Sequence, residues 1–327
     1  MSPVGSAPTS AGPWALSRTE AAMIRGSAVA SDAVVGIVRG RWSQAVPAAL
    51  LGACADVGVD AIELVADELR VVLDDAGQPR VQGAEGVTHL APAVVHRQPW
   101  AQIAMAALER RGVVALNPAA AAAVADDKAA TGVVLAAAGV AQVPTIVTSD
   151  QLGQVADAAE LIGYPVVVKR THGAQGRWVR LVRSHAELSA ALADLAADGP
   201  SALVLQPFVT SAANGSGSHG ARTIRAIVTG GRVVAATERA AHPDDFRTNV
   251  YLGGRQHAVE LTRVQSAMAA ASAAALGLGH AGVDLIETGD GPAILEVNAC
   301  PDFTSMRAHS GTDIAAEVVE QLLRSGK

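Results

Sequence analysis

The centre of the sequence is the run Val283-Asp284-Leu285-Ile286-Glu287-Thr288-Gly289-Asp290-Gly291-Pro292-Ala293-Ile294-Leu295-Glu296-Val297-Asn298. Two apolar segments flank residues 288–292, whose composition is typical of a turn, so the run predicts a β-hairpin. Side chains alternate along a strand, so Glu296 and Asn298 share a face, and pairing could bring Asp284 across from them. Such an oxygen-only set suits Mg²⁺ or Mn²⁺. A solvated hairpin face is the alternative interpretation of this pattern taken alone.

The bulk composition limits the classes of protein. The 327 residues suffice for two or three packed units, and with 50% hydrophobic but 3% aromatic residues we expect a core of Ala, Val and Leu. The net charge of −6 and the lack of a basic run argue against a nucleic-acid partner. Cys54 and Cys300, far apart, indicate a reducing compartment, so we expect a cytoplasmic protein. No apolar stretch of about 18 residues occurs, so no membrane span is expected.

Residues 1–33 and 34–118 differ in character. The first segment is rich in Ser, Ala, Gly and Pro and lacks the pattern of a secretory signal, so we expect much of it to be disordered. The second alternates strands with helices, which predicts a small parallel sheet in an α/β domain. Its expected strands are 34–38, 60–65 and 88–95, and its expected helices are 47–58 and 100–111.

Residues 119–210 begin with an alanine-rich segment that favours a helix. Asp126 is expected to cap a second helix, which runs through Leu135 and ends at Gly139. A new strand is expected from Val143. Further strands are expected at 164–169, 179–182 and 202–206, and helices at 150–163 and 184–197. Lys169 leads into a glycine-containing turn, which could hold phosphate or could be a plain hairpin with a surface lysine.

Residues 211–327 carry the central hairpin. Before it we expect a loop at 210–221, paired strands at 223–228 and 232–238, a polar loop at 245–249 and a helix at 263–276; a last helix follows at 313–323. Gly277-Leu278-Gly279-His280-Ala281-Gly282 matches the G-x-G-x-x-G pattern. A dinucleotide fingerprint needs a strand before it and a helix after it, and here the order is reversed. The glycines more simply end one helix and lead into the strand at Val283.

Taken together, these motifs resemble the RimK-like branch of the ATP-grasp carboxylate–amine ligases over about residues 34–325. The matching pieces are 127–128, 166–176, 238–239, 245–249, 253–254, 281–284 and 296–301. The resemblance implies an α/β (α+β) ATP-grasp fold. In it, a small N-terminal α/β domain at 34–118 precedes two α+β lobes at 119–210 and 211–327, and these lobes enclose ATP.

The resemblance also implies residue roles. Two Mg²⁺ (or Mn²⁺) ions that bridge the ATP phosphates would be held by Asp284, Glu296 and Asn298. The residues implied to contact ATP are Lys128, Lys169, Gly173, Gly176, Gln206, Pro207, Phe208, Arg247, Thr248 and Asn249. Of these, Pro207 and Phe208 would form the hinge that binds adenine through backbone atoms.

The implied chemistry is activation of a carboxylate as an acyl phosphate, followed by attack of an amine. Arg239 is expected to stabilise the oxyanion of the second step, or alternatively to form a structural salt bridge with Glu238 or another acid. Arg225 and Arg97 are candidates to bind a substrate carboxylate, because the guanidinium fork suits that group. Gly253 and Gly254 are further candidates for substrate contact.

Four positions depart from the family pattern. Thr223 stands where relatives carry an acid that binds the ATP ribose. Trp178 replaces a small residue in the phosphate loop, where it could cap the site or simply pack. Leu252 replaces a basic residue, which puts an acidic, glutamate-type substrate in doubt. Cys300 replaces a serine, and the acyl-phosphate route needs no nucleophilic cysteine.

The leading hypothesis is therefore an ATP-dependent ligase that joins an amino acid or amine to a carboxylate of a small molecule, peptide or carrier protein. A kinase on the same scaffold, which would phosphorylate a hydroxyl, is the alternative, and a non-catalytic ATP-binding module is the third possibility. Family members are commonly dimers or tetramers, so a homo-oligomer is expected.

Overall fold

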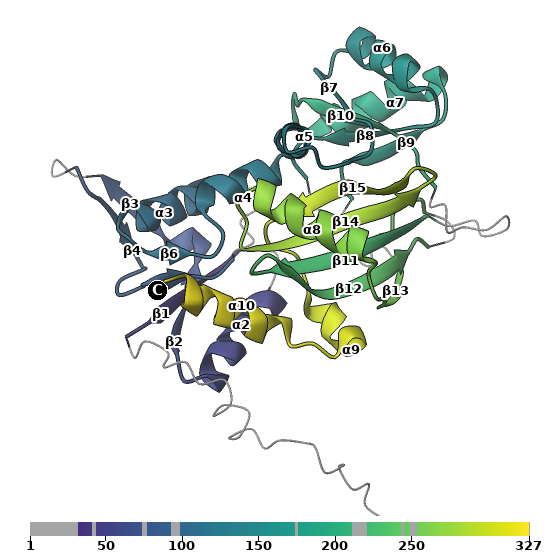
Figure 1. Ribbon diagram of the computed structural model, residues 1–327. Coiled ribbons are helices and arrows are strands. Elements are labelled where there is room, and N and C mark those ends of the chain that lie inside the picture. The colour runs from purple at the N-terminus through teal and green to yellow at the C-terminus, as the bar shows by residue number, and fades with distance from the viewer. Residues whose placement is uncertain are drawn as a thin grey trace, which may run out of the picture.

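The computed structural model describes residues 32–40, 44–73, 77–92, 99–173, 176–210, 221–242, 245–248 and 254–326. Most of the segment expected to be disordered, and the loop at 211–220, lie outside these residues. The described chain packs into three units, numbered here in chain order. In Figure 1 the first unit (β1 to β6) lies at the lower left, and the second (β7 to β10) lies above the third (β11 to β15). None of the described helices is long and apolar enough to cross a bilayer.

The N-terminal unit contains the parallel sheet that the alternating pattern predicted. Its strands are β1 (Val34–Arg39), β2 (Asp60–Val65), β5 (His89–Leu90) and β6 (Val114–Ala115), ordered β2-β1-β5-β6 with all pairs parallel. Helices α2 (Ala45–Asp56) and α3 (Pro99–Arg110) complete it. The expected strand at 88–95 is wrong in its length, since the described strand ends at Leu90; Val94 and Val95 lie outside the described residues. An antiparallel hairpin of β3 (Arg70–Leu73) and β4 (Pro79–Gln82) was not predicted.

Two short helices, α4 (Ala119–Asp126) and α5 (Lys128–Ala137), connect the first unit to the second. The expected cap at Asp126 is wrong, because Asp126 is the last residue of α4. The backbone is extended at Asp127, and one carboxylate oxygen of Asp127 accepts hydrogen bonds from the Ala129 and Ala130 N–H groups at 2.8 and 3.0 Å. This cap fixes where α5 begins and so places Lys128 on its first turn.

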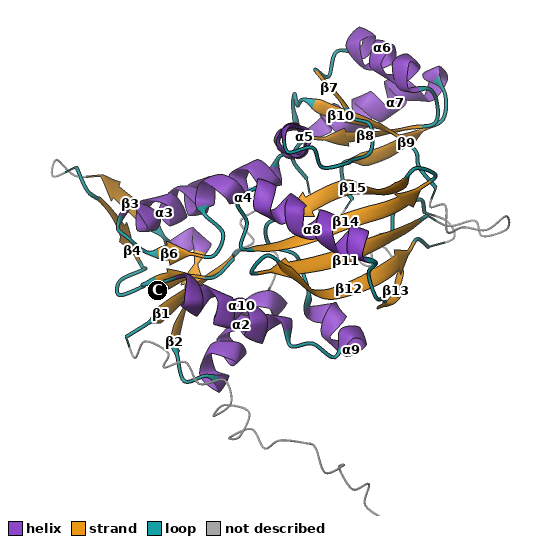
Figure 2. Ribbon diagram, viewed as in Figure 1, coloured by secondary structure: helices purple, strands orange, loops and turns teal. Residues whose placement is uncertain are grey.

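The second unit is an antiparallel sheet with two helices on one face (Figure 2). Its strands are β7 (Ile146–Thr148), β8 (Val166–Arg170), β9 (Val179–Val182) and β10 (Leu203–Pro207), in the order β7-β10-β8-β9; its helices are α6 (Leu152–Ile162) and α7 (His185–Leu195). Val166 and Val168 of β8 join the core beneath the helices. Alternation therefore turns Lys169 to the other face, together with Val204 and Gln206 of the neighbouring strand.

The third unit is a five-stranded antiparallel sheet in the order β13-β12-β11-β14-β15. Its strands are β11 (Arg222–Thr229), β12 (Arg232–Ala240), β13 (Arg255–Ala258), β14 (His280–Thr288) and β15 (Gly291–Asn298). The predicted hairpin is confirmed as β14 and β15, with Asp284 directly across from Glu296. A register shift after Asp284 leaves Leu295 as an extra residue. Helix α8 (Arg263–Ala275) packs on the apolar face of the sheet, where Val283, Leu285 and Val297 are buried.

The chain ends by returning to the first unit. After the 3₁₀ turn at Thr304–Met306 and helix α9 (Arg307–Ser310), helix α10 (Ile314–Ser325) packs against α2 in a shared core. Asn117 adds a polar tie, because its amide exchanges hydrogen bonds with the His280 backbone and donates to the Ala299 carbonyl. The G-x-G-x-x-G segment lies between α8 and β14, so the reversed order of its flanking elements is confirmed.

Candidate active site

The register of the five-stranded sheet gathers polar side chains on the face opposite α8. Arg225 of β11 lies between Thr237 of β12 and Asp284 of β14, and Asp284 lies across from Glu296 of β15. Cross-strand neighbours project to the same side, so these residues form one row across four strands. The opposite face carries buried apolar residues, and burial of that face fixes which side chains turn toward the row.

Arg225 and Asp284 form a buried ion pair in which the Nε and Nη2 groups of Arg225 donate to the two carboxylate oxygens. Their side chains are only 11% and 16% exposed. Burial opposes ionisation of both groups, but the charge and hydrogen bonds of the partner prevail, so the pKa of Arg225 is raised and the pKa of Asp284 is lowered. Arg225, which was expected to bind the substrate carboxylate, therefore forms an ion pair with Asp284, a candidate metal ligand.

Arg239 is 9% exposed and lies one strand away from this pair. Its Nε–H is buried and has no hydrogen-bond partner in the part of the chain that the structure describes. Burial, followed by the charge of Arg225, lowers the pKa of its guanidinium to about 10. Glu238 turns to the other face, where it pairs with Arg222 at 2.5 Å and His257 at 3.6 Å. A salt bridge between Arg239 and Glu238 is thus wrong, since adjacent residues of a strand point in opposite directions. A salt bridge between Arg239 and another acid stays a prediction.

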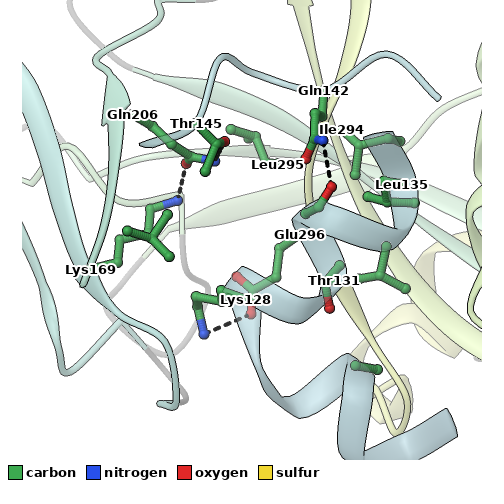
Figure 3. Close-up of a pocket in the computed structure, with 14 residues that line it drawn as sticks. Lys128, Thr131, Leu135, Gln142, Thr145, Lys169, Gln206, Ile294, Leu295 and Glu296 are labelled. Carbon is green, nitrogen blue, oxygen red and sulfur yellow. Dashed lines mark hydrogen bonds and ion pairs between the residues drawn. The ribbon is translucent and has the colours of Figure 1, made fainter. Parts of the chain in front are cut away.

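Two lysines approach the hairpin from other elements (Figure 3). Lys128 Nζ donates to the Gly173 carbonyl at 2.9 Å and lies 3.5 Å from Glu296 Oε1. Lys169 Nζ donates to Gln206 Oε1 at 2.6 Å, and the Gln206 amide donates in turn to Thr145 at 3.0 Å. Burial lowers the pKa of Lys169 to about 8, although the charge of Glu296 acts in the opposite direction.

A pocket opens between these lysines and the edge of β15 (Figure 3). It spans about 390 Å³ including its open mouth, and combines apolar walls with a few polar groups, as small-molecule sites do. Its lining residues come from α4, α5, β8, β10, β15 and the segment before β7: Ala125, Lys128, Thr131, Gly132, Leu135, Gln142, Thr145, Lys169, Val204, Gln206, Ile294, Leu295, Glu296 and Val297. Gln142 and Thr145 were not predicted, because no motif marks them.

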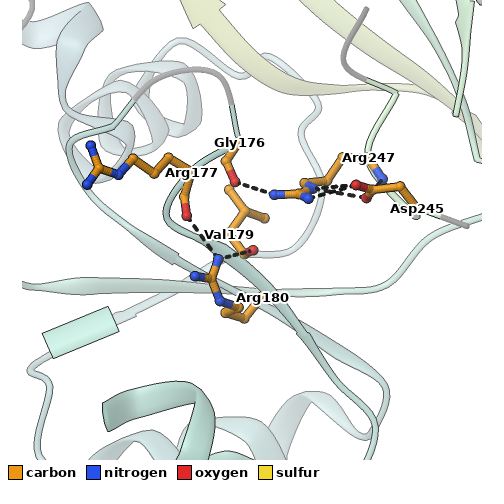
Figure 4. A network of polar contacts seen from close by, with 6 residues as sticks. All are labelled: Gly176, Arg177, Val179, Arg180, Asp245 and Arg247. Atoms are coloured by element: carbon orange, nitrogen blue, oxygen red, sulfur yellow. Dashed lines mark hydrogen bonds and ion pairs between the residues drawn. The ribbon is translucent and has the colours of Figure 1, made fainter. Parts of the chain in front are cut away.

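Arg247 connects the loop at 245–248 to the glycine loop of the second unit (Figure 4). Its Nη1 donates to the Gly176 carbonyl at 2.7 Å, while Nη2 binds Asp245 at 2.7 Å. Hydrogen bonds from Arg247 lower the pKa of Asp245 and raise that of Arg247. Thr248 shares a hydrogen bond of 2.6 Å with Thr223. This network holds Gly176, in the glycine-containing turn that follows β8, beside the five-stranded sheet.

Some of the remaining residues singled out from the sequence lie in the described part of the chain, and others lie outside it. Pro207 is the last residue of β10. The backbone N–H of Phe208 donates a hydrogen bond to the Pro165 carbonyl at 3.0 Å. Gly254 directly precedes β13. Arg97, Asn249, Leu252 and Gly253 lie outside the described residues. Trp178 packs against the core of the second unit. The guanidinium carbons of Arg170 and Arg177 lie 5.5 and 4.7 Å from the centroid of its ring.

The donor set on the hairpin fits a hard divalent cation. Asp284 and Glu296 are a cross-strand pair, and Asn298 follows one step along the same face, so three side chains with oxygen atoms lie together. Among the described residues, the buried Asn298 Nδ2 group has no hydrogen-bond partner. No group of three or more His, Cys, Asp or Glu side chains gathers as a metal site in this part of the chain, and the predicted set on the hairpin consists of two carboxylates and one amide.

Two α+β lobes that meet at a pocket with two lysines and facing carboxylates define an ATP-grasp enzyme. The chain belongs to the RimK-like ATP-grasp family, whose domain model matches residues 125–322. This family consists of carboxylate–amine ligases that form C–N bonds with ATP, and Mg²⁺ is used in the family, so the ligase interpretation is supported over the kinase alternative.

Individual relatives agree with this assignment. A probable alpha-L-glutamate ligase of Xanthomonas euvesicatoria pv. vesicatoria is 35% identical over 252 residues, which cover 77% of this chain and 78% of the relative. The crystal structure of the D-cycloserine synthetase DcsG has the same fold, with a TM-score of 0.69 and 24% identity over 90% of this chain and all of that one. The ATP-grasp ligase PsnB, in complex with a precursor variant, Mg and ADP, has a TM-score of 0.67 and 17% identity over 91% and 100%.

Proposed function

We propose that this enzyme uses ATP to phosphorylate a substrate carboxylate and then joins the acyl group to an amine, with the row of Arg225, Asp284 and Glu296 at its reaction centre. The single observation that carries the proposal is that Glu296, at the end of this row, lies 3.5 Å from Lys128 and lines a pocket between the lobes together with Lys128 and Lys169. We propose the division into three parts that the sequence suggested: an N-terminal domain at 34–118, a central ATP-grasp lobe at 119–210 and a C-terminal ATP-grasp lobe at 211–327.

ATP is proposed to lie in the pocket between Lys128 and Lys169. The apolar side chains of Leu135, Val204 and Leu295 suit adenine, and Gln206 beside Lys169 supplies polar contacts at the same wall. The phosphates would extend toward Lys128 and the glycine loop, whose carbonyls at Gly173 and Gly176 are held by Lys128 and Arg247. Fixing these carbonyls orients the backbone of the loop before the nucleotide arrives.

Asp284, Glu296 and Asn298 are proposed to hold two Mg²⁺ ions. Bound there, the cations would neutralise phosphate charge while the carboxylate and ATP, both anions, approach each other. Arg225 keeps Asp284 ionised and oriented, and Lys128 lies 3.5 Å from a carboxylate oxygen of Glu296.

The first step forms a bond between a carboxylate oxygen and the γ-phosphorus, breaks the bond from that phosphorus to the bridging oxygen and releases ADP. In the second step the amine lone pair attacks the acyl carbon, the carbon–oxygen bond to phosphate breaks, and the amine gives up a proton. Arg239 is proposed to stabilise the negative oxygen of this step, since its buried Nε–H has no competing partner.

The substrates are proposed to be an amino acid or other amine and a carboxylate of a small molecule, peptide or carrier protein, handled by a homo-oligomer. A relative named as an alpha-L-glutamate ligase supports an amino acid as one of the two substrates. The test is a panel of amino acids and carboxylic acids, screened for ADP release and then for product mass. An amide with free phosphate supports the proposal, whereas a phosphorylated alcohol contradicts it.

A further inference from the structure

Gln256 on the edge strand β13 is a buried acceptor that the proposed function leaves unused. It pairs with Arg239 in the register of β12 and β13, so both side chains project to the face of the reaction row. The Gln256 Nε2 group donates to the Ser305 carbonyl at 3.3 Å, which sets the orientation of the amide. The Oε1 atom of Gln256 and the Nε–H of Arg239 are both buried, and neither has a hydrogen-bond partner among the described residues.

An unpartnered acceptor next to an unpartnered donor is costly unless a ligand completes both. A buried polar atom without a hydrogen bond loses its hydration and gains nothing in return. A ligand that satisfies both atoms must offer an acceptor to Arg239 and a donor to Gln256. Because neighbouring strands lie about 4.8 Å apart, the two groups must sit close together in the ligand.

The polar groups on this face of the sheet differ in type from strand to strand, from β15 at one edge to β13 at the other. Carboxylates and an amide lie on β15 and β14, guanidinium groups follow on β11 and β12, and the neutral acceptor of Gln256 lies on β13. A carboxylate over Arg225 and Arg239 would thus have the rest of its molecule directed toward Gln256. An N–H group beside the carboxylate is the donor that this arrangement fits.

We propose that Gln256 is a specificity-determining residue that accepts a hydrogen bond from an N–H group next to the substrate carboxylate. The substrate class is an α-amino carboxylic acid, with its nitrogen either free or acylated as in the last residue of a peptide. This inference rests on the proposed function, because it takes the carboxylate at Arg239 as the group that is activated.

The test is binding, measured by calorimetry on the full chain with Mg²⁺ and a non-hydrolysable ATP analogue. The probes are matched triplets: L-alanine, N-acetyl-L-alanine and propanoate; L-leucine, N-acetyl-L-leucine and 4-methylpentanoate; L-glutamate, N-acetyl-L-glutamate and glutarate. In the triplet that binds best, an N–H-bearing member should bind at least about 10-fold more tightly than its des-amino analogue, as loss of one buried hydrogen bond implies.

Gln256→Leu should reduce this preference to less than about twofold. The control is His257→Leu on the other face of the same strand, which should keep it, because His257 pairs with Glu238. Gln256→Glu retains an acceptor and should keep the preference. If the substrate nitrogen is a free ammonium, Gln256→Glu should bind the free amino acid more tightly than the wild type does, because the variant adds a negative charge. If the substrate nitrogen is acylated, the wild type should bind the N-acetyl member more tightly than the free amino acid.

The inference is overturned if no triplet member binds, if the wild type does not discriminate, or if discrimination survives in Gln256→Leu. The inference is also overturned if His257→Leu loses the binding preference as fully as Gln256→Leu does, because the effect would then come from a disturbed strand and not from the amide. Turnover is measured separately as ADP release with ATP. Binding preference without any ADP release would contradict the proposed function and leave the role of Gln256 supported.

Discussion

Arg225 holds both carboxylate oxygens of Asp284 from the adjacent strand, and both side chains are largely buried. The two residues are 59 positions apart in the chain and meet because β11 and β14 pair with Arg225 across from Asp284. A buried ion pair of this kind loses hydration on folding, and the Asp284 carboxylate depends on the guanidinium charge to remain ionised. The pair therefore links the stability of the sheet to the orientation of a proposed metal ligand.

Removing one member of this pair should destabilise the protein strongly. Arg225→Met should lower the free energy of unfolding by about 3 kcal/mol, because it leaves a buried carboxylate without its cation. The double variant Arg225→Met with Asp284→Leu should recover much of this loss, since no buried charge remains. Urea denaturation at pH 7 measures both, and equal stability of the single and double variants would contradict the assignment.

The same pair should make stability depend on pH. The folded-state pKa of Asp284 lies below its ordinary value of about 3.9, so the ionised carboxylate contributes stability above that pH and the contribution is lost as pH falls through the folded pKa. The difference in unfolding free energy between wild type and Arg225→Met should thus be largest at pH 7 and shrink as the pH falls toward 3, because protonation neutralises the unpaired carboxylate of the variant before that of the wild type. A difference that stays constant down to pH 3 would argue against Asp284 as its source.

Lys169 should give nucleotide binding a pH dependence of its own. Burial lowers its pKa to about 8, so the ammonium is present below that pH and is lost above it. The affinity for ATP should fall as pH rises through about 8 if Lys169 contacts the nucleotide. Lys169→Arg should remove this step, because a guanidinium stays charged throughout. Equilibrium binding between pH 6.5 and 9.5 tests this, and a step that persists in the arginine variant has another origin.

Arg239 should matter for turnover more than for ATP binding. Arg239→Ala should reduce kcat by about 10²–10³, the range measured when one donor to a developing oxyanion is removed. ATP affinity should change less than about threefold, because the side chain lies on β12, away from the pocket lining. Arg222→Ala, on the other face of the sheet, is the control and should leave kcat unchanged. Unchanged turnover in Arg239→Ala would remove the proposed role.

Local patterns predicted the hairpin well, because two apolar segments around a turn determine both the strands and their alternation. Long-range pairing was harder to foresee. The contact of Arg225 with Asp284 depends on a strand register that no local signal encodes, so it was not predicted. Binding of a substrate carboxylate by Arg225 stays a prediction. Strand β13, Arg-Gln-His-Ala, lacks apolar alternation because it lies at a sheet edge, and Gln256 was therefore missed.

The cap of α5 shows the same limit on a smaller scale. Asp126 and Asp127 are adjacent and chemically alike, so composition alone does not choose between them. The choice is made by the backbone, which becomes extended at Asp127 as α4 ends.

The most direct measurement follows oxygen from the substrate carboxylate. With a carboxylate substrate labelled with ¹⁸O, complete turnover should transfer one labelled oxygen to each phosphate released, because the carboxylate oxygen that attacks the γ-phosphorus leaves with it. Glu296→Gln should slow label transfer and ADP release together, since both depend on the hairpin carboxylates. Amide formation with unlabelled phosphate, or label transfer unaffected by loss of Glu296, would contradict the account.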